Sequence, residues 1–294
     1  MMLWRLLFIV VIGATVGILS EKHYCQEPQG REPVTAKCNA GNVILTKKTS
    51  SQSSTFTGNG ITYSSDRAVD GNYDKCSITD NKQSWWKIDL RGIYNISCIS
   101  IFNINATHAD ITNALIYIGN SRRNNGTNNT LVQTIKAFTV CKSNVYNFTP
   151  SVGRYITMFF PRDKVAVLCE VNINGTIKES PFILIKKKMI WEDALYYCRD
   201  NYKDLASILD EEAQAFAELE AEKADTEYVW LGLHYTCTLQ FWFWVDNHAV
   251  EFERWNISSK QENCDMSGVM MKNEEHFWHT KSDYEMYNFI CAKK

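Results

Sequence analysis

The sequence predicts two domains of different class, an all-β sandwich or jelly roll followed by an α+β domain. Short strand-like runs separated by turn-forming clusters fill residues 38–175, where no helical periodicity appears. Two amphipathic helical segments and then further strand-like runs fill residues 180–294. The length of 294 residues also fits two domains.

The first half contains runs rich in β-branched and aromatic residues, namely "NVILTKK", "SWWKIDL", "CISIFNI", "ALIYIGN" and "GRYITMFF". Clusters of Gly, Asn, Ser and Asp separate them, as in "VDGNYD" and "NNGTNNT". Short strands at this spacing are typical of a β-sandwich or jelly roll.

The second half changes its periodicity near residue 182. Helical spacing relates Trp191, Leu195, Cys198 and Tyr202, which predicts an amphipathic helix. Asp210 is the expected N-cap of a second helix with the sequence "EEAQAFAELEAEK". The runs "YVWLGLHY", "FWFWVD", "GVMMK" and "NFICA" follow and predict a small sheet, so that the domain is α+β.

Residues 1–20 read as a secretory signal peptide. One cation, Arg5, precedes an apolar run from Leu6 to Leu19, which is shorter than the ~20 residues of a membrane span. The alternative is an uncleaved anchor with everything after it outside the cell. Either interpretation places the protein outside the cell, and we expect it to be secreted. Residues 21–37 form an N-terminal segment before the first domain.

Composition and motifs argue against nucleic-acid binding, enzymatic activity and a cysteine metal site. The net charge of −2 and the lack of a basic stripe argue against nucleic-acid binding. The six histidines include no H-E-x-x-H pair, and no nucleophile motif is present, so we expect no enzymatic activity. The ten cysteines are even in number and lack C-x-x-C spacing, which favours disulfides over a metal site in an exported chain.

Asn-x-Ser/Thr sequons predict a glycoprotein. Six of the seven lie between residues 95 and 174, which suggests exposed surface there. The acceptors are Asn95, Asn105, Asn125, Asn128, Asn147, Asn174 and Asn256.

The second half resembles a C-type lectin-like domain over about residues 180–294. The resemblance rests on "WEDALYYC", "WLGL", "FWFWVDN", "FERW", "ENC" and "FIC", which occur in the family's order. It implies a bridge between Cys198 and Cys291. One partner of the family's inner bridge fits Cys264, but the other position, near Asp283, is not cysteine. We therefore expect Cys264 to pair with Cys237.

The resemblance also implies where a calcium-borne sugar site would lie. Members that bind sugar carry Glu-Pro-Asn or Gln-Pro-Asp in one loop and Trp-Asn-Asp in a later strand, whose oxygens are hard ligands for Ca²⁺. This chain reads "RWNISSKQENC" and "FWHTKSD" in those places. We expect the C-type fold without its usual calcium-borne sugar site.

The first half resembles an F-type lectin (fucolectin) domain, a jelly roll related to discoidin-like domains. Five segments carry the resemblance: "SSDRAVDGNYDKC", "SWWKIDL", "ALIYIGNSRRNNGTNN", "GRYITMFFP" and "LCEVNI". It implies a bridge between Cys76 and Cys169. The remaining cysteines leave Cys98 with Cys141 and Cys25 with Cys38 as the expected pairs.

The F-type family holds a structural calcium ion, and the resemblance carries its ligands to matching positions. These are the side chains of Asp70, Asn72 and Glu170, with backbone oxygens near Arg67, Lys75 and Cys169. Carboxylate and carbonyl oxygens suit Ca²⁺. The alternative is that Asp70 and Asn72 only form an Asx turn around the intervening glycine.

The family grips fucose with one histidine and two arginines, and this chain substitutes all three. The histidine position falls at Ile78, the first arginine at Asn103 or Ile104, and the second at Asp110. Charged donors contribute ~1.5–3 kcal/mol each, so the resemblance implies a fucose affinity a hundredfold or more below the family's. A glycan on Asn105 would lie in the same loop.

The sequence therefore predicts a secreted lectin-type recognition protein, by analogy one of innate immunity, with altered or lost sugar sites. In one version it binds glycans or glycoproteins through contacts such as those of Trp242 or of the 105–111 loop. In the other it binds a protein ligand and no sugar. A homo-oligomer is compatible with the sequence, and an enzyme is the least supported alternative.

Overall fold

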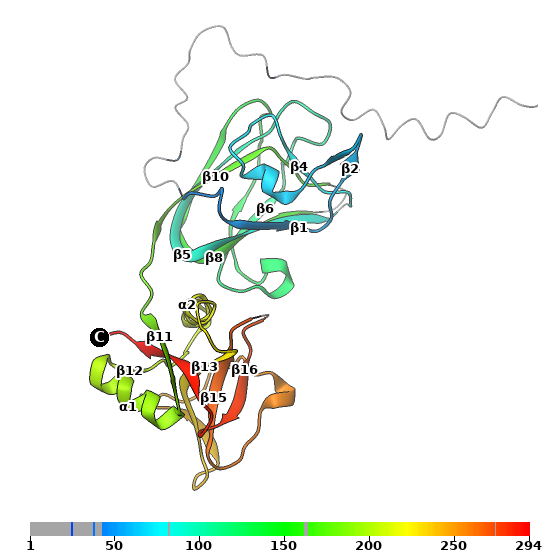
Figure 1. Ribbon diagram of the computed structural model, residues 1–294. Helices are drawn as coiled ribbons and strands as arrows, with labels where there is room; N and C mark the ends of the chain where they lie inside the picture. Colours follow the sequence, from blue (N-terminus) through cyan, green and yellow to red (C-terminus); the bar gives the residue numbers. More distant parts are fainter. Residues whose placement is uncertain (1–24, 26–37, 39–42, 82, 162–163, 274) are drawn as a thin grey trace, which may run out of the picture. The chain divides into compact units, whose positions relative to one another are not determined.

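The computed structural model describes residues 25, 38, 43–81, 83–161, 164–273 and 275–294. The chain forms two compact units, one comprising residues up to Leu90 together with Tyr94–Thr176, and one comprising Arg91–Ile93 together with Ile177–Lys294. No helix within the described ranges is long and apolar enough to span a membrane. The fold is a β jelly roll followed by an α+β domain, as predicted (Figure 1).

The first unit is built on a sheet with the strand order β1-β5-β8-β6-β7, in which β10 also pairs with β5. The long strands β5 and β8 form an antiparallel ladder along much of their length. The strands are β1 (Thr49–Gln52), β5 (Ser84–Phe102), β6 (Leu115–Gly119), β7 (Thr130–Thr134), β8 (Asn144–Phe160) and β10 (Glu170–Ile177). Two short pairs complete the unit, β2 (Thr57–Gly58) with β3 (Ile61–Thr62) and β4 (Ser77–Ile78) with β9 (Val167–Leu168). Two 3₁₀ turns, Ser65–Ala68 and Arg123–Gly126, lie between strands.

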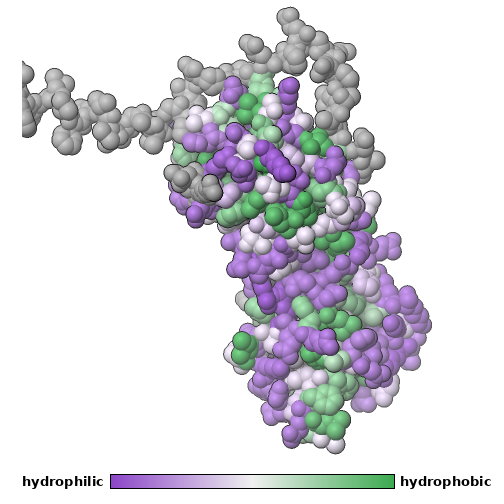
Figure 2. All heavy atoms as spheres, turned by 180° about the vertical axis from the view of Figure 1, so that it is seen from behind, coloured by the Kyte–Doolittle hydropathy of each residue, from purple (hydrophilic) through white to green (hydrophobic). Residues whose placement is uncertain are grey.

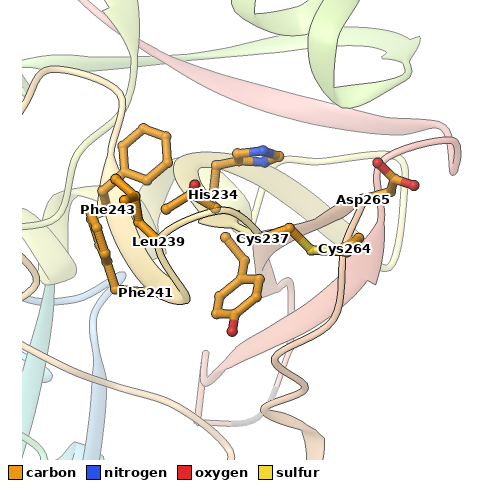
Figure 3. A pocket seen from close by; sticks show the side chains of 9 residues that line it. His234, Cys237, Leu239, Phe241, Phe243, Cys264 and Asp265 are labelled. Carbon is orange, nitrogen blue, oxygen red and sulfur yellow. A yellow bond between two sulfur atoms is a disulfide. The ribbon is translucent and has the colours of Figure 1, made fainter.

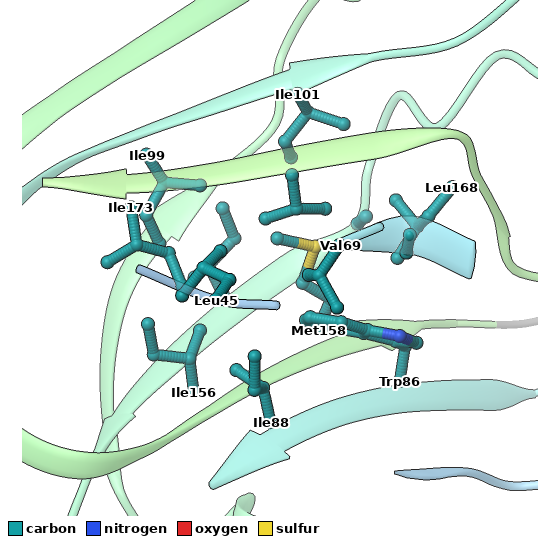
Figure 4. Close-up of a cluster of buried hydrophobic side chains, with 14 of the residues drawn as sticks. Leu45, Val69, Trp86, Ile88, Ile99, Ile101, Ile156, Met158, Leu168 and Ile173 are labelled. Atoms are coloured by element: carbon teal, nitrogen blue, oxygen red, sulfur yellow. The ribbon is translucent and has the colours of Figure 1, made fainter. Parts of the chain in front are cut away.

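Strand alternation explains the core of this unit. Trp86, Ile88 and Leu90 are fully buried on one face of β5, while the residues between them are only partly buried. Met158 comes from β8, and its side chain lies close to that of Trp86 in the cluster drawn in Figure 4. The pattern "SWWKIDL" thus reports a strand with one face in the core.

The second unit contains two helices that pack against a sheet with the strand order β11-β17-β13-β15-β16 (Figure 1). β13 and β17 run parallel, and the other strand pairs described in this sheet are antiparallel. The elements are β11 (Phe182–Met189), α1 (Trp191–Asn201), β12 (Asp204–Leu205), α2 (Glu211–Ala221), β13 (Tyr228–Thr236), β14 (Phe241–Trp244), η3 (Ile257–Ser259), β15 (Met266–Met271), β16 (Trp278–Ser282) and β17 (Tyr287–Ala292).

The predicted helix cap at Asp210 is confirmed. Its Oδ1 accepts a hydrogen bond from the backbone N–H of Ala213 at 2.7 Å. This bond satisfies one of the N–H groups that the first turn of a helix leaves without an intrahelical partner.

Five disulfides link the ten cysteines, and three of them agree with the expected pairs. These are Cys76–Cys169, Cys198–Cys291 and Cys237–Cys264. The expected pairs Cys25–Cys38 and Cys98–Cys141 are wrong, because the structure joins Cys25 to Cys141 and Cys38 to Cys98.

The register of β5 against β8 is the physical reason for this correction. Cys98 lies opposite Asn147, whereas the N–H of Cys141 donates to the carbonyl of Asn103 at 2.7 Å. Cys141 is therefore level with Asn103, which follows the end of β5 and lies five residues beyond Cys98, a separation of ~16 Å in extended chain. A disulfide requires Cα atoms about 4.4–6.8 Å apart, so these two cysteines cannot meet.

The predicted glycosylation sites differ in exposure. Asn174 lies in β10 and is only 6% exposed. The acceptors Asn95, Asn105, Asn125, Asn128 and Asn147 are exposed, and Asn256 is half-buried. A tripeptide motif does not reveal such differences in burial.

Candidate functional site

The position that matches the family's histidine, Ile78, lies at the end of β4 beside a small apolar cluster. Cys76, Cys169, Ala109 and Val167 form the buried part of this cluster, and Ile78 packs against it. The backbone N–H of Ile78 is also hydrogen-bonded, because it donates to the carbonyl of Tyr63 at 3.1 Å. The position contributes apolar packing and offers no charged donor to a ligand.

Asn103 is fully buried and acts as a structural bridge between loops. Its Nδ2 donates to the carbonyls of Ala109 and Val167, each at 2.8 Å. Its Oδ1 accepts from the N–H of Cys169 at 3.0 Å. All of these partners are backbone groups, so the amide joins the 103–109 loop to the end of β9.

Asp110 is exposed but its carboxylate is bound within its own loop. Oδ1 accepts from the N–H of Thr112 at 2.9 Å and from its hydroxyl at 2.6 Å. The Thr112 hydroxyl is the main reason that the pKa of Asp110 is lowered, and Lys164 adds to the effect. Lys164 fixes the same loop by donating to the carbonyls of Asp110 and Thr112. The side chain therefore stabilises loop geometry and carries a negative charge.

The predicted calcium residues meet at a turn in the first unit. Oδ1 of Asp70 accepts from the N–H of Asn72 at 2.8 Å. This bond forms the Asx turn that was the alternative to a calcium site. Glu170 comes from the far end of the domain sequence, and its Oε2 accepts from the N–H of Gly71 at 3.1 Å. The nearest cation is the Nζ of Lys75, 3.9 Å from Oδ2 of Asp70. Two carboxylates thus converge on one glycine turn.

Glu170 is the electrostatically unusual member of this group. It is only 4% exposed, and burial raises its pKa to about 7, with the nearby charge of Asp70 also raising it. A carboxylate in this state lacks a compensating positive charge. No group of three or more His, Cys, Asp or Glu side chains placed to hold a metal occurs in the part of the chain that the structure describes. Any cation here would rely on backbone oxygens as well.

Where the resemblance places the later strand of the C-type sugar site, the side chains are engaged in packing and hydrogen bonding. Trp278 is fully buried, and its Nε1 donates to Oε1 of Gln214 at 2.9 Å. His279 is buried and packs edge-on against Tyr228, with ring centroids 5.4 Å apart. The hydroxyl of Thr280 accepts from the N–H of Gln261 at 3.1 Å. These side chains support the sheet and the loop that precedes β15.

A pocket of about 500 Å³ opens at the β13–β14 hairpin of the second unit, and sequence reasoning did not find it. Figure 3 shows Leu239, Phe241 and Phe243 on one side, Asp265 on the opposite side, and the Cys237–Cys264 bridge between them. Phe241 is 48% exposed and Leu239 is 66% exposed. Apolar side chains thus remain in contact with solvent around this pocket.

His234 lines the same pocket and is held by several neighbours. Its ring stacks on Trp191 with centroids 4.5 Å apart, and Nδ1 lies 2.9 Å from the hydroxyl of Ser267. Oδ2 of Asp283 lies 3.7 Å from the same nitrogen. Burial lowers the pKa of His234, against the opposing effects of Asp283 and Asp265.

The alternation in "FWFW" was the signal that could have revealed this pocket. Trp242 and Trp244 are buried, whereas Phe241 and Phe243 face the other side of β14 and line the pocket. A strand with aromatic residues on both faces leaves one aromatic face without a partner unless another element covers it. Figure 2 shows that apolar residues on the displayed face occur in separate groups among hydrophilic ones.

Comparisons with known proteins agree with the two-domain division. A lectin C-type domain model matches residues 187–293, and a model described as a NedA-like, galactose-binding domain matches residues 67–158. Both models fall within the β and α+β units described above.

Among curated proteins, the chain is 33% identical to fucolectin-5 of Anguilla japonica over 183 residues, or 60% of this chain and 90% of that protein. It is 35% identical to fucolectin-1 of the same species, over 37% of this chain and 67% of that protein. A crystal structure of an F-lectin from striped bass (Morone saxatilis) serum is 25% identical, covers 54% of this chain and 59% of that one, and has a TM-score of 0.43. The chain belongs to the fucolectin family, and it carries an F-type and a C-type lectin-like domain in tandem.

Proposed function

We propose that this protein is a secreted recognition lectin whose F-type domain no longer holds fucose through the three charged donors of its family. The relatives at 33–35% identity are named fucolectins. A fucosylated glycan is therefore the ligand with which we compare the binding of this domain. The protein would still recognise surface glycans or glycoproteins, but through other contacts. An extracellular role in innate recognition fits a chain with five disulfides.

The observation that carries this proposal is the hydrogen bonding of Asn103. The resemblance places the first arginine at Asn103 or Ile104. An arginine at position 103 would present a guanidinium to a ligand, whereas the Asn103 amide donates to two backbone carbonyls and accepts from a backbone N–H. Ile78 contributes packing and Asp110 binds Thr112, so neither offers a cation. A neutral sugar held mainly by charge-assisted donors would lose several kcal/mol, a hundredfold or more in affinity.

A fucose column tests this proposal directly. The full chain is applied to immobilised L-fucose at millimolar calcium and again with chelator, and a fucolectin with an intact histidine and two arginines serves as the positive control. We expect no retention of this protein under either condition. Retention that free fucose releases would contradict the proposal, provided that circular dichroism shows the protein to be folded.

A glycan array then separates the two versions of recognition. Binding to a defined set of glycans supports a lectin with altered specificity. If the folded protein binds no glycan on the array, a protein ligand is favoured instead. The lectin-like domains would then bind that protein without a sugar.

We also infer a structural calcium ion in the F-type domain. The side chains of Asp70, Asn72 and Glu170 would hold it, with backbone oxygens near Arg67, Lys75 and Cys169. The raised pKa of the buried Glu170 supports this, because a divalent cation would supply the positive charge that its surroundings lack. The ion would tie the glycine turn to the start of β10.

A further inference from the structure

We propose that the pocket at the β13–β14 hairpin binds an arginine or lysine side chain presented by a partner protein. The site belongs to the C-type domain, and the proposal does not depend on whether the F-type domain binds fucose. Its parts are an aromatic wall, a carboxylate on the opposite side and a cavity between them of about 500 Å³ (Figure 3).

The aromatic wall suits the stem and the head of a basic side chain. Phe241 is 48% exposed, and its ring centroid lies 6.2 Å from that of Phe243. Rings in contact with solvent attract a guanidinium or ammonium through their π faces and cover its methylene groups. Tyr235 and Leu239 extend the same apolar lining.

The opposite side supplies a negative charge that no lysine or arginine neutralises. Asp265 is exposed, lines the pocket, and forms no ion pair with a cation among the described residues. Behind it, the N–H of Asp283 donates to the carbonyl of Asp265 at 2.9 Å, which holds the two acidic residues side by side. The buried Oδ1 of Asp283 has no hydrogen-bond partner within the described part of the chain.

On the acidic side, Oδ2 of Asp283 lies 3.7 Å from Nδ1 of His234. Burial raises the pKa of Asp283, against the lowering effects of a hydrogen bond from Ser267 and of the nearby His234. The imidazole stacks on Trp191 and packs edge-on against Phe243, with ring centroids 4.5 Å and 5.8 Å apart. A cation entering between the wall and Asp265 would meet attraction from both sides.

The same lining disfavours a sugar as the occupant. A pyranose carries hydroxyl groups around its ring, and each needs a polar partner when buried. The wall of Leu239, Phe241 and Phe243 provides none from its side chains. A basic side chain needs one carboxylate and an apolar channel, which is what the pocket contains.

The test uses the full chain with its disulfides intact and measures ligand affinity by NMR titration. The probes are Nα-acetyl-arginine amide, Nα-acetyl-lysine amide, the uncharged citrulline analogue of the first, and glucose. We expect the arginine and lysine probes to bind at least ~10-fold more tightly than citrulline, which corresponds to a charge-assisted contact. Their affinity should fall as salt is added.

Two variants locate the binding. Asp265→Asn keeps the shape of the side chain and suits the positive φ of 57° at this residue, since asparagine tolerates that conformation. It should weaken the arginine probe ~10-fold, and Phe241→Ala should weaken it ~3-fold. The matched controls Glu251→Gln and Ile257→Ala alter exposed residues outside the pocket and should leave affinity unchanged.

Three results would each overturn the proposal. One is equal affinity for the arginine and citrulline probes, or no binding of either. Another is an Asp265→Asn variant that binds the arginine probe as tightly as its Glu251→Gln control. The third is glucose binding more tightly than both basic probes, which would assign the pocket to a sugar.

Discussion

The side-chain oxygen of Asn103 accepts a hydrogen bond from the backbone N–H of Cys169, 3.0 Å away and shielded from solvent. This bond joins Asn103 to the bridge Cys76–Cys169. The buried amide thus supports the loops around it. This role in stability can be measured separately from binding.

Replacing Asn103 by alanine should destabilise the first unit by ~2–4 kcal/mol. The change leaves the carbonyls of Ala109 and Val167 and the N–H of Cys169 buried without their partner. Chemical denaturation, monitored by fluorescence, measures the decrease in the free energy of unfolding. Asn263→Ala, an exposed residue of the second unit, is the control and should change little. An Asn103→Ala protein as stable as this control would contradict the structural role.

Calcium should raise the unfolding temperature of the first unit, and chelator should lower it. A ligand present at a hundred times its dissociation constant stabilises the native state by ~2.7 kcal/mol. Glu170→Gln removes the buried carboxylate charge and should abolish the calcium-dependent shift. Asp80→Asn changes an exposed acid of the same unit and should preserve it. Calorimetry that shows the same shift in both variants would remove the calcium site from this turn.

The disulfide pairs can be mapped by mass spectrometry of an unreduced tryptic digest. Trypsin cuts after Arg31 and Lys37, between Cys25 and Cys38, and after Lys136, between Cys98 and Cys141. We expect one linked species that joins Cys25 to Cys141 and another that joins Cys38 to Cys98. Peptides linking Cys98 to Cys141 would contradict the register of β5 and β8. The Cys198–Cys291 link in the same digest is the internal control.

Glycan occupancy should follow burial. In protein secreted from eukaryotic cells, Asn174→Gln should not lower the mass by a glycan, because Asn174 is buried in β10. Asn105→Gln should lower the mass by one N-glycan, because Asn105 is exposed. Intact-mass measurement before and after enzymatic deglycosylation distinguishes these results. A glycan found on Asn174 in folded protein would mean that β10 is wrongly placed.

The sequence predicted the elements wherever local chemistry decides them. The helix that begins after Asp210 followed from its capping side chain, and the strand β5 followed from the β-branched and aromatic run "SWWKIDL". Two of the five disulfides, Cys76–Cys169 and Cys198–Cys291, agreed with what the family resemblances imply. In each case the relevant pattern lies within one segment or is fixed by a family motif.

The sequence by itself determined the class of both domains and the absence of charged donors at Ile78, Asn103 and Asp110. Only the tertiary structure decided how Cys25, Cys38, Cys98 and Cys141 pair, since pairing depends on strand register rather than on spacing. It also brought Asp265 opposite Phe241, residues that are distant in sequence and meet only because the β13–β14 hairpin folds beside the start of β15. Pockets arise from such long-range contacts, which no local pattern encodes.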